Sequence, residues 1–526
     1  MQRRDFLAAG AAGAAALALS ACARRAPIEG DFNGLDIARG HALRDGTWRG
    51  APARTRRTRV LIVGGGVAGL AAARALRLQG IEDFALLELE DHAGGNARGT
   101  QVSGVACPMG AHYLPVPDDD DRVVLDLLEE LGLRRRVAGR WEYDEIHLCH
   151  SPQERLFFNG QWQDGLLPVQ GVPDATLAQY RRFAQRIDAL SRQAAFNIPV
   201  AGAAVVPLLL ELDALSFSDW LGREGFDDPR LRWYLDYCCR DDYGAGHACV
   251  SAWAGVHYFA SRHGFQAPGD DRQERDAVLT WPQGNAWLTQ RLAAPLGERL
   301  LGAQVALRIA ETRDGVEADV YDVAAHEQVR WQAERCIVAV PIFIAARIVE
   351  NPPAVLRAAA QGLRYAPWLV ANAHIRAPLP IAPREALPSW DNVLYGTAGL
   401  GYVDARHQDL DPTPRPTVLS WYRPLGPSGY DPANADGARL LQDRPWSGWR
   451  DDLLTELSVA HPSLPELVTR IDITRYGHAM AIPTPGRLRQ LGAPARVVAG
   501  RLAFAHADWS GYSIFEEAFT RGHMAA

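Results

Sequence analysis

A glycine-rich segment near residue 64 constrains the fold of this chain more than any other feature. The apolar run Val60-Leu61-Ile62-Val63 predicts a buried strand, and the segment 64–69 that follows reads Gly-Gly-Gly-Val-Ala-Gly, which fits Gly-x-Gly-x-x-Gly. The Ala- and Leu-rich stretch to Leu78 predicts a helix, and Phe84 to Glu88 predicts a second strand ending in a carboxylate. This order of elements is typical of a unit that binds a dinucleotide.

Each part of this unit has a chemical role. Gly64 permits the tight turn, Gly66 lets the backbone approach a pyrophosphate, and Gly69 lets the helix pack closely on the strand. The first helical residues, Val67-Ala68, offer the phosphates N–H groups that have no partner within the helix. We expect Glu88 to accept hydrogen bonds from the ribose hydroxyls of the adenosine. The unit alone does not distinguish FAD from NAD.

Composition limits the partners and the chemistry. The formal net charge is −7, so the chain lacks the basic field that a nucleic-acid partner requires. All 55 basic residues are Arg, so no reaction of this protein can use a lysine. The cysteines and histidines do not show the spacing of a metal site, and we therefore expect none. Whether the cysteines form disulfides is left open by the sequence.

Motifs after Glu88 favour FAD. Glu88 is followed by five residues and then by Gly94-Gly95-Asn96-Ala97-Arg98. This sequence resembles the segment by which the flavin amine oxidase and phytoene desaturase group approaches the FAD pyrophosphate. Asn96 stands where that group usually has Arg, so we expect Arg98 to contact the phosphate, beside Gly95. The turn Gly110-Ala111-His112 resembles the small-residue turn that the group places against the isoalloxazine ring.

The resemblance extends to the C-terminal part of the chain. Val305 falls where the backbone of that group contacts the adenine, and Val338-Ala339-Val340-Pro341 matches its buried strand ending in proline. The segment from Phe504 to Tyr512 is similar to the Trp-Ser-Gly-Tyr element of the monoamine oxidases, which precedes their terminal helix. The resemblance implies that Asp508 faces the ribityl or phosphate region. It also implies that the helix start, at Ser513-Ile514, directs its positive end at the flavin.

These motifs identify the sequence as a member of the flavin-containing amine oxidoreductase superfamily, with an α/β fold. The resemblance implies a discontinuous, Rossmann-like FAD-binding domain on the two-dinucleotide-binding-domain plan, interrupted by an inserted α+β substrate domain. Residues 23–56 are rich in Gly, Arg, Pro and Ala and are interpreted as a tether and an irregular arm. We expect the FAD-binding domain to comprise residues 57–115, 276–350 and 471–526, and the substrate domain residues 116–275 and 351–470.

The chain departs from the family pattern around the flavin. Amine oxidases of the group typically bridge a lysine to flavin N5 through water, a feature linked to reaction with oxygen, but this chain has no lysine. Of their aromatic pair, Tyr512 matches one member and Ala479 occupies the position of the other. His478 falls where some monoamine oxidases attach the flavin through a cysteine; a histidyl–flavin bond, a histidine beside the ring edge and a packed neutral histidine are the alternatives. We infer that electrons pass to a quinone or protein acceptor rather than to oxygen.

The inserted segments carry further candidates for catalysis. Residues 237–243 and 251–262 combine acids, aromatics and a histidine in helical settings. One interpretation makes them a cavity wall in which Asp241, Asp242 or His257 acts as a proton acceptor or polar anchor. The other is an ordinary interface in which Arg240 pairs with Asp242 and the aromatics are core.

The N-terminus resembles an export signal. Arg3-Arg4-Asp5-Phe6-Leu7 precedes an Ala- and Gly-rich stretch too short for a membrane span, as in a twin-arginine signal. Leu19-Ser20-Ala21-Cys22 resembles a bacterial lipoprotein cleavage box, with Cys22 as the lipidated residue. The alternative is a short helix with a chance cysteine. We expect residues 1–22 to direct the protein through the twin-arginine export machinery. The protein would then be lipid-anchored through Cys22 on the periplasmic side of a bacterial membrane.

The function that these motifs imply is FAD-dependent hydride transfer from a small or medium organic substrate, of which an amine is one candidate, to flavin N5. The catalytic candidates are Asp242, His257, His478 and Tyr512. The first alternative is a desaturase-like flavoenzyme acting on an apolar substrate. The second is a non-catalytic FAD-binding protein that serves as an electron carrier or assembly partner.

Overall fold

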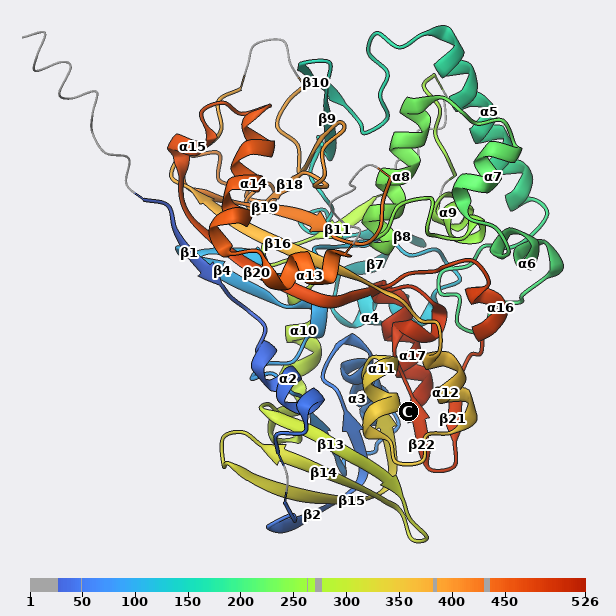
Figure 1. Ribbon diagram of the computed structural model, residues 1–526, viewed down its shortest axis with the longest axis vertical. Helices are drawn as coiled ribbons and strands as arrows, with labels where there is room; N and C mark the ends of the chain where they lie inside the picture. Colours follow the sequence, from blue (N-terminus) through green and yellow to red (C-terminus); the bar gives the residue numbers. More distant parts are fainter. Residues whose placement is uncertain (1–26, 49, 263, 270–276, 382–385, 430–435) are drawn as a thin grey trace, which may run out of the picture.

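The computed structural model describes residues 27–48, 50–262, 264–269, 277–381, 386–429 and 436–526. Two large sheets organise it, one in the lower half of Figure 1 and one in the upper half, with helices around both. The predicted twin-arginine pair and Cys22 lie outside the described residues. Within the described residues, no helix is both long and apolar enough to cross a membrane.

The first sheet contains the dinucleotide-binding unit. Its central strands β2 and β3 pair in parallel, and β2 also pairs in parallel with β15, which comes from the middle of the sequence. β22, from the C-terminal segment, adds to β15 in parallel, so three distant parts of the chain share one sheet. Its strands, in order, are β12 (Leu300–Leu301), β3 (Phe84–Leu87), β2 (Arg54–Val63), β15 (Glu327–Val338), β14 (Val316–Asp322) and β13 (Gln304–Glu311). β22 (Leu502–Phe504) pairs with β15, and β21 (Val497–Ala499) pairs with β22.

Close backbone contacts at glycines hold helix α3 against this sheet and helix α17 against α3. Helix α3 (Val67–Leu78) follows β2 through Gly64, whose φ of 105° lies in a region that favours glycine. A Cβ at Gly69 would stand 1.8 Å from the Gly64 carbonyl oxygen, so only glycine permits this packing of the helix. Helix α17 (Phe515–Ala525) packs on α3 in turn, and a Cβ at Gly522 would stand 2.0 Å from the carbonyl oxygen of Ala68.

The second sheet combines segments that the sequence assigns to different domains. Strand β20 lies inside it, parallel to β1 on one side and antiparallel to β16 on the other. Its strands, in order, are β1 (Glu29–Phe32), β20 (Val468–Ala481), β16 (Tyr365–Ile375), β19 (Thr417–Pro424), β18 (Tyr402–Asp404), β17 (Asp391–Leu394), β9 (Glu154–Phe158) and β10 (Gln161–Asp164).

Two expectations about the domains are therefore corrected. Residues 23–56 are more than an irregular arm, because Glu29–Phe32 forms β1, Ile37–Asp45 forms helix α2 and β2 already begins at Arg54. Residues 471–481 belong to β20 of the second sheet, although they were assigned to the FAD-binding domain. In both cases the strand is specified by pairing with residues about a hundred or more positions away, which local periodicity does not reveal.

The remaining helices and hairpins surround the second sheet and join the two sheets. A helical block formed by α5 to α9 lies at the upper right of Figure 1. Two hairpins pair β4 (Gly99–Val102) with β5 (Val105–Pro108) and β7 (Arg134–Val137) with β8 (Arg140–Tyr143). β6 (Tyr113–Pro115) forms an antiparallel pair with β11 (Val278–Thr280), which is distant in the sequence. The helices are α4 (Arg122–Glu130), α5 (Asp174–Ser191), α6 (Pro207–Asp213), α7 (Phe217–Arg223), α8 (Pro229–Tyr243), α9 (Ala252–Ala260), α10 (Ala286–Ala293), α11 (Ile342–Ile348), α12 (Ala354–Ala360), α13 (Gly437–Asp443), α14 (Trp446–Ser458), α15 (Leu464–Leu467) and α16 (Arg487–Leu491).

Candidate active site

A cavity of about 460 Å³ runs between the two sheets. Its volume lies in the range of sites that bind small molecules and cofactors. All of the residues predicted to bind the cofactor line it except Gly69, which packs α3 on its strand, and Arg98. Those that line it are Gly64, Gly66, Val67, Ala68, Glu88, Gly95, Asn96, Gly110, Ala111, His112, Val305, Asp508, Ser513 and Ile514.

The glycine turns form a cradle for phosphate groups. Gly94 N–H donates to the carbonyl oxygen of Gly65 at 2.8 Å, and a Cβ at Gly95 would lie 3.1 Å from the Gly66 Cα. The two turns therefore touch through backbone alone. The N-cap of α3 is Gly66, which provides no side-chain cap, so the first N–H groups of the helix face the cavity without a side-chain acceptor. This arrangement suits a pyrophosphate.

The side chain of Glu88 is fixed beside this cradle. Its two carboxylate oxygens accept the N–H groups of Gly65 at 2.7 Å and Glu90 at 2.9 Å. Burial raises the pKa of Glu88, and the two backbone donors act in the opposite direction. Since each oxygen retains a lone pair, the carboxylate remains able to accept ribose hydroxyls.

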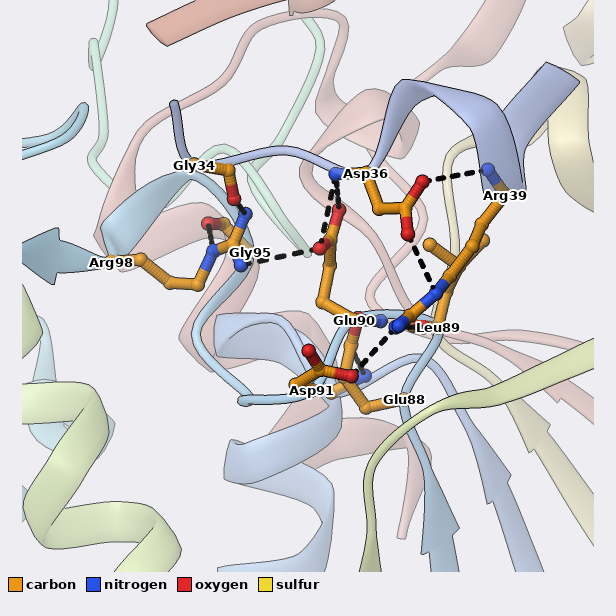
Figure 2. Close-up of polar contacts among 10 residues, drawn as sticks. Gly34, Asp36, Arg39, Glu88, Leu89, Glu90, Asp91, Gly95 and Arg98 are labelled. Carbon is orange, nitrogen blue, oxygen red and sulfur yellow. Dashed lines mark hydrogen bonds and ion pairs between the residues drawn. The ribbon is translucent and has the colours of Figure 1, made fainter. Parts of the chain in front are cut away.

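Arg98 does not take the predicted role at the phosphate. Its guanidinium donates to the carbonyl oxygens of Gly34 at 3.0 Å and Gly95 at 3.3 Å, and lies 3.5 Å from the carboxylate of Glu90 (Figure 2). The prediction rested only on the replacement of the family's usual Arg by Asn96. The ordered arm offers Arg98 a carbonyl acceptor on the side away from the cavity.

Asp508 supplies a fixed negative charge to the cavity wall. It accepts the Tyr365 hydroxyl at 2.5 Å and the Ile342 N–H at 3.0 Å, and lies 3.2 Å from the ring of His506. Burial alone would raise its pKa, but His506 and these hydrogen bonds hold the pKa of Asp508 below its ordinary value. The N-cap of α17, Ile514, also provides no side-chain cap, so the positive end of this helix faces the cavity.

Aromatic rings enclose the part of the cavity next to the second sheet. The ring of His112 stacks on Tyr422, with 4.4 Å between centroids, and Trp368 and Tyr113 also line this part. Burial lowers the pKa of His112 to about 3, so its imidazole is neutral at physiological pH. Strand β16, where the family's lysine would be expected, presents Trp368 and Val370 to the cavity.

Two of the four catalytic candidates lie outside the cavity wall. Tyr512 donates to the carboxylate of Glu517 at 3.3 Å and packs against His257, whose Nε2 lies 2.9 Å from the carbonyl oxygen of Asn197. Both side chains lie in the core behind the wall. The turn at Gly511, with φ of 85°, directs Tyr512 into this core and leaves residues 513–516 facing the cavity.

The other two candidates, His478 and Asp242, line the cavity. Burial lowers the pKa of His478, and its ring lies 4.5 Å from that of Phe343. Asp242 pairs with Arg262 at 3.2 Å, whereas Arg240 pairs with Asp236, so the expected pairing of Arg240 with Asp242 is wrong.

A cluster of acidic side chains faces the aromatic part of the cavity. Asp241, Asp242 and Glu516 contribute three carboxyl groups, and Arg262 contributes one guanidinium. Burial, followed by the neighbouring charge of Asp242, raises the pKa of Asp241 to about 7. Burial raises the pKa of Glu516 to about 8. Sequence reasoning named Asp241 and Asp242 but missed Glu516 and Arg262, because no local pattern brings α17 to the end of α8.

Comparisons with known proteins agree with this geometry. The family model described as flavin containing amine oxidoreductase matches residues 67–526. A putative flavin-containing monoamine oxidase, AofH of Mycobacterium tuberculosis, is 27% identical over 300 residues, which cover 56% of this chain and 59% of that protein. Flavin-containing amine oxidase B of Homo sapiens is 24% identical over 301 residues, covering 56% of this chain and 52% of that protein. The chain thus spans a little over half the length of these curated relatives.

Solved structures share the fold. Putrescine oxidase bound to putrescine superposes with a TM-score of 0.67 at 21% identity, over 89% of this chain and 98% of that chain. Cyclohexylamine oxidase from Brevibacterium oxydans gives a TM-score of 0.65 at 19% identity, over 89% and 97%. A fatty acid isomerase from P. acnes gives a TM-score of 0.61 at 16% identity, over 89% and 97%.

The raised pKa of Asp241 predicts a specific dependence of stability on pH. The folded protein keeps this proton up to a pH of about 7, whereas the unfolded chain loses it near the ordinary value of 3.8. The unfolded state therefore binds fewer protons between these values, and the free energy of unfolding falls as pH rises through this window. We expect Asp241→Asn to remove this loss and to stabilise the FAD-loaded protein by on the order of 1–2 kcal/mol at pH 8 relative to pH 5.

The measurement is urea unfolding of the wild type and the variant across this pH range. Asp126→Asn provides the matched control, because Asp126 is a helical but exposed aspartate. An Asp241→Asn variant with the same pH dependence as the wild type would contradict the assignment.

Proposed function

Because this chain belongs to the flavin-containing amine oxidoreductase family, we propose that it oxidises an amine whose positive charge is held by Asp241. Its cofactor is FAD. The observation that carries the proposal is the excess of carboxyl groups over guanidinium groups in an otherwise aromatic part of the cavity. A cationic substrate would neutralise carboxylates whose ionisation is costly in this buried setting.

Different residues of the cavity have different roles in such a reaction. FAD, held by the glycine turns and Glu88, would supply the oxidising power as the acceptor of a hydride from a substrate C–H bond. Asp241, with a pKa of about 7, is suited to hold the ammonium group and to take the proton that the nitrogen must lose before the hydride leaves. Tyr422 and Trp368 exclude water from the aromatic part of the cavity. The ammonium thus loses one proton to Asp241 and one hydride from its C–H bond, and becomes a protonated imine.

The charge of the site distinguishes between the candidate substrates. This fold accommodates different chemistry, since its structural neighbours are named for putrescine, for cyclohexylamine and for a fatty acid. A purely apolar substrate, as a desaturase-like activity would use, leaves Asp241 and Glu516 buried without a counter-charge. An amine provides that charge, which supports an amine over the apolar alternative. The enclosed aromatic wall supports an enzyme over an electron carrier.

We expect amines, but not the matching neutral alcohols, to bleach the flavin of the FAD-loaded protein under anaerobic conditions. Asp241→Asn should weaken amine binding by about ten- to hundred-fold, because it removes a charge-assisted hydrogen bond. In the wild type, amine affinity should rise as pH increases through about 7, since Asp241 becomes ionised there, and this step should be absent in Asp241→Asn.

Rapid-mixing absorbance of the flavin, followed across a concentration series, gives the binding constant and the reduction rate separately. Asp126→Asn should behave as the wild type, because its side chain is exposed and does not line the cavity. Equal reduction of Asp241→Asn and the wild type, or no reduction by any amine, would refute the proposal.

We propose further that the reduced enzyme passes its electrons to a quinone or a protein rather than to oxygen. The support is chemical: the family feature linked to reaction with oxygen is a lysine, and this chain contains only Arg among its 55 basic residues. Strand β16 places Trp368 and Val370 at the cavity in that region.

The prediction concerns reoxidation. After anaerobic reduction, a soluble quinone should restore the oxidised flavin spectrum at least about ten-fold faster than air-saturated buffer at equal acceptor concentration. Stopped-flow absorbance measures both rates in one preparation. Reoxidation by oxygen at the rate of a good oxidase would exclude this proposal while leaving amine oxidation intact.

We also propose that the protein is exported in a folded state by the twin-arginine machinery and anchored by a lipid on Cys22. The support is the order of two sequence features. Arg3-Arg4, which resembles an export signal, precedes the Leu-Ser-Ala-Cys sequence, which resembles a lipidation site. Export after folding suits a protein that must acquire FAD in the cytoplasm.

Two variants test this localisation in a bacterial host. Replacing Arg3 and Arg4 by Lys should keep the FAD-loaded protein in the cytoplasm, because the receptor reads the arginine pair. Cys22→Ser should leave export possible but shift the exported protein from the membrane fraction to the soluble fraction. Cell fractionation with activity and flavin measurements reports both. Membrane association of Cys22→Ser equal to that of the wild type would rule out the anchor.

A further inference from the structure

The segment that joins β1 to helix α2 connects the two sheets. Residues Glu29–Phe32 pair in parallel with β20 of the second sheet, and Asn33 N–H extends this ladder to the carbonyl oxygen of Ile473 at 2.8 Å. Helix α2 then lies beside the first sheet, at the loop that follows Glu88 (Figure 1). The whole segment precedes residue 67, where the family match begins, so the family does not assign it a role.

Polar contacts hold α2 against the loop after Glu88. Asp36 N–H donates to both carboxylate oxygens of Glu90, at 3.1 and 3.3 Å. Arg39 donates to the carbonyl oxygen of Leu89 at 3.0 Å and to the carboxylate of Asp91 at 2.8 Å (Figure 2). Residues 89–91 thus hold the helix immediately after the carboxylate that is placed for the adenosine ribose.

The inner side of α2 forms part of the cofactor cavity. Gly40 and Leu43 line the same cavity as Glu88 and Val305. A Cβ at Gly40 would have no neighbouring atom within 4 Å, apart from the backbone of the helix itself, so the protein leaves space there. The helix has nine residues and none of them is buried. A helix this short is marginal by itself in water. Its Leu43 packs, half-buried, against the core of the first sheet.

We propose that residues 29–45 form a strap that closes the cavity over the adenosine end of FAD and slows its release. Leu43 and Gly40 provide the outer wall of the adenosine site, and bound FAD provides the surface on which α2 rests. Arg39 and Asp36 position the helix by holding it to residues 89–91. Because strap docking and FAD binding stabilise each other, the cofactor enters before the strap closes and leaves only after it opens. This inference depends on the FAD cofactor and not on the proposed amine substrate.

The first test compares two arginines of the same helix. Arg39→Ala removes the contacts to Leu89 and Asp91, whereas Arg44→Ala removes only an ion pair with Asp45 in which both side chains are more than half exposed, at 58% and 56%. We expect FAD to dissociate about ten-fold faster from Arg39→Ala than from the wild type, and at the wild-type rate from Arg44→Ala. The fluorescence of released FAD after dilution measures these rates. Equal rates in all three proteins would overturn the proposal.

The second test follows the helix itself. Hydrogen exchange of the backbone amides in residues 37–45 should be slow in the FAD-loaded wild type and accelerate by about ten-fold or more when FAD is removed, while amides of β20 change less. Leu43→Ala, which shortens the wall without altering the polar contacts, should also release FAD several-fold faster. Exchange in α2 that is independent of FAD, or a Leu43→Ala variant that retains FAD as the wild type does, would overturn the strap.

Discussion

The structure depends on one close contact, that of helix α3 with the end of strand β2. Only glycine at position 69 allows the helix backbone to reach the Gly64 carbonyl, and the Gly65 N–H then reaches the carboxylate of Glu88 at 2.7 Å. This contact fixes the position of the helix N-terminus at the carboxyl end of the central strand β2. The free N–H groups of the helix, the second glycine turn at Gly95 and the acidic Glu88 all converge there, so the phosphate and ribose positions follow from a single packing constraint.

The two ends of the cavity have opposite electrostatic character. At the cofactor end Glu88 accepts two backbone N–H groups, and His506, Tyr365 and the start of α11 hold the pKa of Asp508 below its ordinary value. At the aromatic end, Asp241 and Glu516 are buried with raised pKa values, and Arg262 is already paired with Asp242. Carboxyl groups whose pKa values are raised in this way lower the stability of the fold when they ionise, and such groups are typical of functional sites.

Local motifs made the cofactor end predictable, and long-range packing made the rest unpredictable. The turns at Gly66, Gly95 and Gly110 need only a few neighbouring residues to define them, and all three line the cavity. Tyr512 was placed by its match to Trp-Ser-Gly-Tyr, yet a left-handed turn at Gly511 rotates it into the core, and a match of letters does not encode that rotation. The contact of Arg98 with the carbonyl oxygen of Gly34 was not predictable, because Gly34 follows strand β1, whose pairing residues in β20 are more than four hundred positions away.

The order of segments around the cavity links cofactor binding to folding of the whole chain. Leu43 precedes the dinucleotide unit, Glu88 belongs to it, Val305 comes from the middle of the sequence and Asp508 from the end, and all four line one cavity. A ligand that contacts all of them joins segments from both ends and from the middle of the described chain, so its binding free energy stabilises the packing of all of these segments. When the ligand is lost, we therefore expect local unfolding to begin in helix α2, which is short and contains no buried residue.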